Sequence, residues 1–217
     1  MSRESQESKK VRMGNIVALL KKEYPNSKCS LNYDSPFQLL VSTILSAQCT
    51  DARVNKVAKR LFKKYPYAID FYNLPLEILK KEIYSTGFYN NKAKSIKGMA
   101  AVVVDKYDGE LPENLSDMVQ LPGVGRKTAN VVLGNVFNIP SLVVDTHVTR
   151  ISNLLKFVNN KDAVKIEKDL MKIVNKDDWT LFAHLIIDHG RAICIANRPR
   201  CRNCTISELC PSSVEML

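Results

Sequence analysis

The run Leu-Pro-Gly-Val-Gly-Arg-Lys-Thr-Ala-Asn at residues 121–130 constrains the fold of this chain more than any other feature of its sequence. Pro122, Gly123 and Gly125 predict a tight hairpin, because glycine adopts the positive φ angles that such a turn requires. Helix-forming residues with an apolar stripe follow over residues 126–136. The hairpin therefore presents backbone N–H groups and a helix N-terminus at one place, an arrangement that binds anions such as phosphate.

Lys127 lies in the first turn of this predicted helix, so its amine is held close to any anion that the hairpin binds. A lysine beside a phosphate site suggests chemistry on a nucleic-acid backbone. An ordinary loop before a core helix has the same Gly-x-Gly pattern, which alone is a weak signal. The chain carries 32 Lys and Arg against 22 Asp and Glu, a net charge of +10 that is typical of proteins that bind polyanions, although a merely soluble basic protein shows it too.

Apolar residues recur at helical spacing along almost the whole chain, and no stretch shows sustained alternation, so the sequence predicts an all-α fold. Ser35 is expected to cap a helix that has Pro36 at its first position. Residues 142–144 are at most one short extended segment. The helical stripes cover residues 13–20, 36–45, 54–62, 76–84, 93–107, 116–120, 126–136, 146–155, 162–174 and 179–189.

The N-terminal residues 1–10 are polar and lack the apolar stretch of a secretory signal, so we expect a disordered tail there and a cytoplasmic protein, associated with the nucleoid if the source is prokaryotic. No run approaches the roughly 20 apolar residues of a membrane span. We therefore expect no membrane partner.

Asp145 stands directly before the helix predicted at residues 146–155. An aspartate in that position is usually only a helix cap. It has a second possible role here, because an amine nucleophile such as Lys127 needs an acid–base partner. The sequence leaves both roles open.

Four cysteines at the C-terminal end, Cys194, Cys201, Cys204 and Cys210, are separated by six, two and five residues. Disulfides are disfavoured because the sequence has no secretory signal, which leaves a thiolate metal site. Both zinc and an iron–sulfur cluster take four cysteines, and the spacing alone leaves that choice open.

The loop between Cys194 and Cys201 contains Arg198 and Arg200, and no acidic residue lies between His189 and Ser207. A metal site would hold this basic loop rigid, in a form that suits contact with phosphate. Alternatively, the metal site only stabilises the C-terminal segment, and the arginines are merely solvated.

Taken together, these motifs resemble endonuclease III, the helix-hairpin-helix family of DNA glycosylases in base-excision repair. The resemblance extends from about Met13 to Cys210 and includes several motifs in order. These motifs are Leu-Ser-Ala-Gln-Cys-Thr-Asp (45–51), Thr-Gly-Phe-Tyr-Asn-Asn-Lys-Ala (86–93), the hairpin, Val-Asp-Thr-His (144–147) and the cysteine pattern.

The resemblance implies a two-domain all-α fold. Residues 29–139 would form a six-helix barrel domain that carries the helix-hairpin-helix. Residues 140–217 would form the domain of a 4Fe-4S cluster, and residues 1–28 would be an N-terminal tail and a helix that packs with that domain.

The resemblance also implies an activity. The chain would be a bifunctional DNA glycosylase that removes oxidised pyrimidines and cleaves the abasic site by β-elimination through a lysine Schiff base. Its partner would be double-stranded DNA with oxidised pyrimidines or abasic sites, and it would act as a monomer.

Site residues follow by the same resemblance. Lys127 and Asp145 match the family's catalytic lysine and aspartate. Gln48 matches the residue that fills the gap left by the extruded nucleotide, and Phe88 stands where the family often has a leucine wedge. The family's four cluster ligands match Cys194, Cys201, Cys204 and Cys210. The remaining expected DNA contacts are Gly123, Gly125, Arg126, Arg198 and Arg200.

Two rival functions remain. The first is a monofunctional glycosylase of the same superfamily, but those enzymes resemble this chain with Ser or Tyr in place of Lys127. Their adenine branch also has a further C-terminal domain, whereas this chain ends seven residues after Cys210. The second is a non-catalytic helix-hairpin-helix DNA-binding protein, which would leave Lys127, Asp145 and the cysteine pattern without a role.

Overall fold

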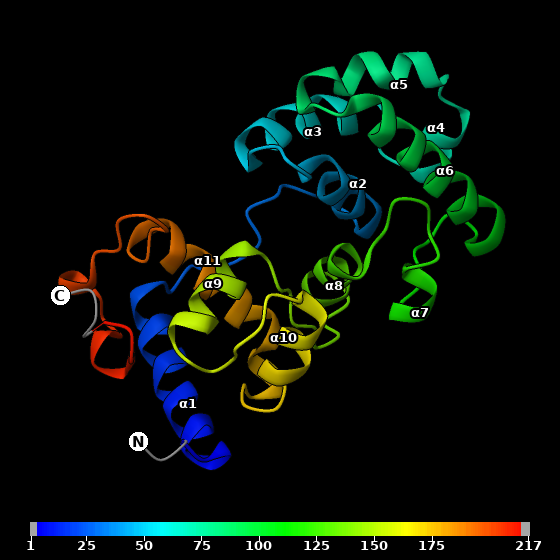
Figure 1. Cartoon of the computed structure of the whole chain (residues 1–217). Helices are drawn as coiled ribbons and strands as arrows, with labels where there is room; N and C mark the ends of the chain where they lie inside the picture. The colour runs from blue at the N-terminus through cyan, green and yellow to red at the C-terminus, as the bar shows by residue number, and fades with distance from the viewer. Residues whose placement is uncertain (1–3, 214–217) are drawn as a thin grey trace. The chain divides into compact units, whose positions relative to one another are not determined.

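The computed structural model describes residues 4–213, and every regular element in this part of the chain is helical (Figure 1). The all-α prediction is confirmed. The α-helices are α1 (Gln6–Glu23), α2 (Pro36–Ser46), α3 (Asp51–Lys64), α4 (Ala68–Asn73), α5 (Leu76–Ile83), α6 (Tyr89–Tyr107), α7 (Leu115–Met118), α8 (Arg126–Asn135), α9 (Thr146–Leu154), α10 (Ala163–Leu170) and α11 (Trp179–Ala192). Short 3-10 helices are η1 (Tyr84–Thr86), η2 (Lys176–Asp178), η3 (Cys201–Asn203) and η4 (Ser207–Leu209).

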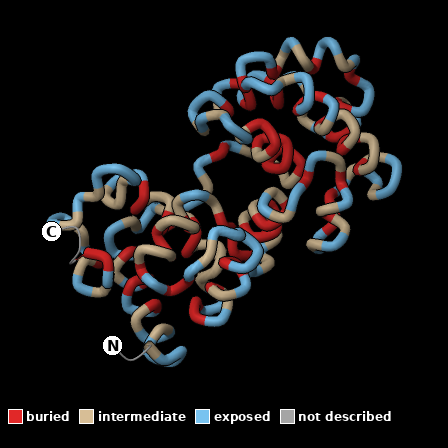
Figure 2. The backbone as a smooth tube through the Cα atoms, in the orientation of Figure 1, coloured by how far each residue is buried: buried red, intermediate tan, exposed pale blue. Residues whose placement is uncertain are grey.

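The chain divides into two compact units. The hairpin unit comprises Ser30–Ile139, and the cysteine unit comprises Met1–Cys29 together with Pro140–Leu217. Within each unit the buried residues gather on the sides of the helices that face their neighbours (Figure 2). Each unit therefore has its own apolar core.

In the hairpin unit, α2 is the most deeply buried helix. It begins as predicted, with Pro36 in its first turn and the Ser35 side chain accepting a hydrogen bond from the Gln38 N–H at 3.2 Å. Leu39, Leu40, Val41 and Leu45 are fully buried. The helix contacts α3, α6 and α8, so it forms the centre against which the hairpin helix packs.

The helix α4 has no counterpart among the predicted segments. Its start is fixed locally, since the Asp70 carboxylate accepts a hydrogen bond from the Tyr67 N–H at 2.9 Å. It packs on α6 and buries Ala68 and Phe71 there.

In the cysteine unit, α1 packs on α11, and α11 packs on α9. The disordered tail expected over residues 1–10 is wrong for most of that range, because α1 begins at Gln6 with Ser5 as its cap. Residues 1–3 lie outside the described part of the chain.

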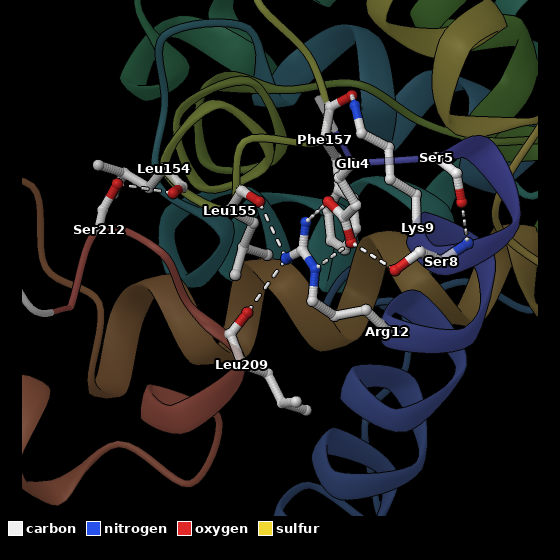
Figure 3. A network of polar contacts seen from close by, with 10 residues as sticks. All are labelled: Glu4, Ser5, Ser8, Lys9, Arg12, Leu154, Leu155, Phe157, Leu209 and Ser212. Carbon is white, nitrogen blue, oxygen red and sulfur yellow. Dashed lines mark hydrogen bonds and ion pairs between the residues drawn. The ribbon is translucent and has the colours of Figure 1, made fainter. Parts of the chain in front are cut away.

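Long-range contacts fix this N-terminus (Figure 3). Arg12 donates two hydrogen bonds to the Glu4 carboxylate, at 2.9 and 2.8 Å, and also donates to the carbonyls of Leu155 and Leu209. Its guanidinium lies 4.0 Å from the centre of the Phe157 ring. Local sequence patterns carry no sign of such partners. Within residues 4–213, no helix is both long and apolar enough to cross a membrane.

Candidate active site

The two glycines of the hairpin have different roles. Gly123 has a φ of +76°, and a Cβ built on it would lie 2.4 Å from the Cβ of Ser95 on α6. Gly125 has a φ of −88°, which any residue adopts, and a Cβ there would meet no atom within 4 Å. The expectation of a positive φ is therefore right for Gly123 and wrong for Gly125. Gly125 instead leaves open space at the start of α8.

The hairpin is anchored to the core. The Val124 N–H donates to the Leu121 carbonyl at 3.0 Å, and both side chains are buried. The apolar face of α8, with Ala129 and Val132 fully buried, continues this anchor. No side chain caps the N-terminus of α8. Because the first N–H groups of a helix have no partner within the helix, they remain suited to an external anion.

Lys127 is the second residue of α8, and its side chain is exposed. Its amine makes no hydrogen bond or ion pair with any residue of the described part of the chain. The neighbouring Arg126 begins the helix and is half-buried. The structure thus places Lys127 in the first turn after the hairpin, as predicted, with its amine available for an external partner.

Asp145 is the N-cap of α9, as predicted, and its Oδ1 atom accepts a hydrogen bond from the Val148 N–H at 2.8 Å. This is the only side-chain hydrogen bond of Asp145 within residues 4–213. The residue is half-buried. One carboxylate oxygen therefore fixes the orientation of the side chain, while the second remains for another partner. Asp145 belongs to the cysteine unit, and Lys127 belongs to the hairpin unit.

Gln48 and Phe88 share an unusual backbone conformation. Both are non-glycine residues in the left-handed region, with φ angles of 52° and 49°. Gln48 is exposed in the turn between α2 and α3, and Phe88 is 63% exposed at the N-cap of α6. A left-handed conformation costs a non-glycine residue about 1–2 kcal/mol, and because Asp108, Asn138 and Lys156 adopt it too, it does not by itself mark a functional site.

The four C-terminal cysteines line one cavity in the cysteine unit. This cavity has a volume of about 30 Å³. The other walls are largely apolar and include Ile151, Leu155, Ile193 and Ile206. The sequence pattern predicted that these thiols belong to one site, and the structure brings all four together.

The surroundings of two of these thiols favour their protonated form. Burial and, to a smaller extent, the neighbouring cysteines together raise the pKa of the Cys204 thiol to about 11. Burial likewise raises the pKa of Cys210. The apolar surroundings of Cys204 and Cys210 therefore disfavour thiolate charge there unless a metal centre compensates for it.

Two further side chains contact the thiols. Arg150 Nη1 donates to Cys194 Sγ at 3.5 Å, and the ring Nε2 of His189 lies 3.6 Å from Cys204 Sγ. Burial and the nearby Arg150 lower the pKa of His189 to about 4, so its ring is neutral at physiological pH. The opposite ring nitrogen, Nδ1, lies 3.2 Å from the hydroxyl of Tyr24, the C-cap of α1.

Four cysteine thiolates are a donor set that zinc and an iron–sulfur cluster both take. Among the described residues, no three His, Cys, Asp or Glu side chains form a group that could hold one metal ion. The cysteines instead surround a shared space with an apolar lining. An iron–sulfur cluster takes four thiolates from the protein and is tuned by hydrogen bonds to sulfur, such as the one from Arg150.

The basic loop beside the cavity is well ordered by its backbone. The Arg200 N–H donates to the Ile193 carbonyl at 3.0 Å, and the Arg198 N–H donates to the Ile195 carbonyl at 3.2 Å. Both arginine side chains are exposed and make no hydrogen bond or ion pair with residues 4–213. The loop thus presents two guanidinium groups on a fixed backbone.

Sequence reasoning missed Lys92, Arg150 and His189. Lys92 lies four residues after Phe88, and its position within an apolar stripe was a signal of burial. Nothing in the sequence marks Arg150 or His189 as neighbours of the cysteines, because those contacts join segments that are far apart along the chain.

Comparisons with known proteins agree on one family. The family model described as HhH-GPD superfamily base excision DNA repair protein matches residues 41–176. Endonuclease III of Synechocystis sp. is 49% identical over 207 residues, which cover 95% of this chain and 94% of that protein. A solved non-covalent endonuclease III–DNA complex matches with a TM-score of 0.90 and 43% identity, over 95% of this chain and 97% of the solved one. A trapped covalent endonuclease III–DNA intermediate matches with the same score and identity, over 95% of this chain and 98% of the solved one.

Proposed function

Since this chain belongs to the endonuclease III family within the HhH-GPD superfamily, we propose that Lys127 is the nucleophile and Asp145 its charged partner. The family makes the protein a base-excision repair DNA glycosylase with abasic-site lyase activity that acts on DNA. The main support for the residue assignment is the position of Lys127 in the first turn after the hairpin. Its side chain is exposed there, and its amine makes no hydrogen bond or ion pair within the described residues.

The substrate is double-stranded DNA that contains an oxidised pyrimidine or an abasic site, and one protein molecule acts on it. The sugar carbon under attack is inaccessible within a duplex, so the damaged nucleotide leaves the stack first, at a cost of a few kcal/mol. Gln48 and Phe88 offset part of this cost by filling the space that the nucleotide leaves. The hairpin N–H groups hold a backbone phosphate beside Lys127, and the open space at Gly125 allows its close approach.

The chemical steps follow from the two side chains. The Lys127 amine attacks the sugar carbon C1′, and the base leaves with the electron pair of the broken bond. The second oxygen of Asp145 stabilises positive charge at the sugar as the base leaves and helps to move protons during the reaction. Opening of the sugar ring gives a Schiff base with Lys127. Loss of a C2′ proton then expels the 3′ phosphate and cuts the strand.

The residues Cys194, Cys201, Cys204 and Cys210 fit the four thiolate ligands of a 4Fe-4S cluster. When bound, such a cluster supplies a covalent cross-link between the end of α11 and the C-terminal segment. The four ligands thereby fix the loop that carries Arg198 and Arg200. Those guanidinium groups, together with Arg126 at the hairpin, bind backbone phosphates independently of base sequence.

Borohydride trapping tests the nucleophile. Reduction of the Schiff base should link wild-type protein irreversibly to lesion DNA, and peptide mapping should place the adduct on Lys127. Lys127→Gln should abolish trapping and strand cleavage while binding to lesion DNA persists, because the hairpin backbone is unchanged. Lys59→Gln, which removes an exposed lysine of α3 in the same unit, serves as the charge-matched control.

Two results would decide against the assignment. A trapped complex formed by Lys127→Gln would mean that another amine is the nucleophile. Base excision by the wild type without any trapping would mean that water attacks the sugar and that the enzyme is monofunctional.

A further inference from the structure

Lys92 is a buried lysine on α6 that takes no part in the steps above. It is 5% exposed. Its Nζ atom donates hydrogen bonds to the carbonyls of Leu45 and Thr86, both at 2.8 Å. These two carbonyls belong to different segments of the hairpin unit, which the ammonium therefore connects.

Both acceptors lie at helix ends. Leu45 is in the last turn of α2, and Thr86 is the last residue of η1. Carbonyls at a C-terminal end lack a partner within the helix and carry partial negative charge, so a buried cation stabilises them. The strained Gln48 follows Leu45 by three residues, and the strained Phe88 follows Thr86 by two.

We propose that Lys92 is a positioning residue that joins the Gln48 turn and the Phe88 turn into one rigid element. Both side chains then enter the DNA together when the nucleotide is extruded. This inference rests on the proposed DNA contacts of Gln48 and Phe88.

The energetics of the site support such a role. Burial lowers the pKa of Lys92, and the nearby Cys49 opposes that effect, so the chain tolerates an unfavourable burial at this position. Left-handed conformations at non-glycine residues persist only where the surrounding structure holds them. Without the amine, two buried carbonyls would be unsatisfied, and either turn would relax independently of the other.

The same helix offers a matched control. Lys97 also donates to backbone carbonyls, those of Phe71, Tyr72 and Leu74, but these lie at the end of α4. Lys97→Met thus removes the same kind of contact from the same helix without touching either turn. Lys92→Met removes the contact under test.

Amide hydrogen exchange of the free protein gives the first readout. Lys92→Met should increase exchange at residues 46–50 and 86–90 together, whereas Lys97→Met should increase it only near residues 72–75. An increase at only one of the two turns, or at neither, would overturn the proposal. If Lys92→Met does not fold, Lys92→Gln replaces it, because the shorter amide cannot reach both carbonyls, so that the link between the turns is lost and exchange should rise at both.

Single-turnover kinetics give the second readout. Lys92→Met should slow excision from duplex DNA by about tenfold or more, because small displacements of positioned groups cost that much. Cleavage at a ready-made abasic site should fall less. The fluorescence rise of a 2-aminopurine next to the lesion should slow in parallel with excision. Equal losses on both substrates, or equal losses in Lys97→Met, would reduce Lys92 to a general stabilising residue.

Failure of the proposed function is distinguishable from failure of this inference. If Phe88→Ala and Gln48→Ala excise lesions at the wild-type rate, the assigned DNA contacts are wrong, and so is a role of Lys92 in nucleotide extrusion. The exchange measurement requires no DNA, and it still decides whether Lys92 joins the two turns.

Discussion

Gly123 lies directly against Ser95 of α6, so that a Cβ on the glycine would overlap the serine side chain at 2.4 Å. Two residues later, Gly125 faces open space. Packing against Ser95 and a φ of +76° thus require glycine at position 123. At position 125 only the approach of a ligand such as a DNA phosphate would require it.

Alanine substitutions should separate these roles. Gly123→Ala should destabilise the protein by at least about 2 kcal/mol, because strain and overlap add. Gly125→Ala should change stability by less than about 1 kcal/mol, because its backbone conformation suits any residue. It should nevertheless weaken DNA binding about tenfold, or 1.4 kcal/mol, by blocking a phosphate at the hairpin. Urea unfolding and DNA titration measure the two effects. Unchanged DNA affinity in Gly125→Ala would exclude close approach of the backbone at this position.

Phe88→Ala should impair nucleotide extrusion more than bond breaking. An aromatic ring that stacks on a base contributes about 1–3 kcal/mol, and the alanine would lose this contact. Excision from duplex DNA should slow more than cleavage at an abasic site, where less unstacking is needed. Phe88→Leu, which restores an apolar wedge, serves as the control and should recover most of the rate. Equal losses on the two substrates would contradict a wedge role.

The sequence predicted those parts of the fold that local signals determine. Ser35 and Pro36 specify the start of α2 through a cap and a fixed φ, and both act within one turn of the chain. The hairpin and the N-cap role of Asp145 were likewise accessible, because glycine, proline and aspartate have strong positional preferences. The helix α1 was predicted too short, since its start is fixed by Arg12, which binds Glu4 and also contacts the C-terminal half of the cysteine unit.

The geometry of the site depends on contacts that leave no local pattern. The family resemblance pointed to Gln48 and Phe88, but neither residue type signals a left-handed backbone. The link through Lys92 joins residues that are 47 positions apart, and Arg150 reaches Cys194 over 44 positions. Such relationships arise from packing, which a single sequence does not display.

The cysteine unit should contain iron and sulfide in equal amounts and absorb broadly in the visible range. Four thiols line one cavity, and burial raises the pKa of two of them, Cys204 and Cys210, which fits a cluster whose charge stabilises thiolates. Cys201→Ser should lose this absorption and weaken DNA binding, because the Arg198–Arg200 loop loses its anchor. Cys29→Ser, outside the cavity, is the matched control and should keep the colour. Stoichiometric zinc in freshly purified protein would contradict the assignment.

The Glu4–Arg12 pair should make stability depend on pH in the acid range. Hydrogen bonding to Arg12 lowers the pKa of Glu4 from its ordinary value of 4.5, although partial burial opposes the shift. A lowered folded-state pKa means that the pair stabilises fully above pH 4.5 and that this stabilisation is lost as the pH falls through the lower, folded-state pKa.

Glu4→Gln should therefore destabilise the cysteine unit at neutral pH by about 1 kcal/mol, a value kept small by solvent screening of a partly exposed pair. The difference from wild type should disappear in strong acid. Urea unfolding at a series of pH values measures this. Glu7→Gln on the exposed side of α1 is the control and should show no such difference. A pH-independent difference for Glu4→Gln would indicate that packing, not charge, is responsible.

Asp145→Asn should separate the cap from the charge. The amide keeps an oxygen that can accept the Val148 N–H, so α9 should remain intact and stability should change little. Base excision should nevertheless fall by about 10²–10³, as when a charge-stabilising group is removed from an active site, while DNA affinity is largely retained. Asp162→Asn is the matched control, because Asp162 caps α10 in the same way, accepting from the N–H groups of Val164 and Lys165. That variant should keep full activity. Near-normal excision by Asp145→Asn would mean that Asp145 serves only as a helix cap and that another group must stabilise the charge at the sugar.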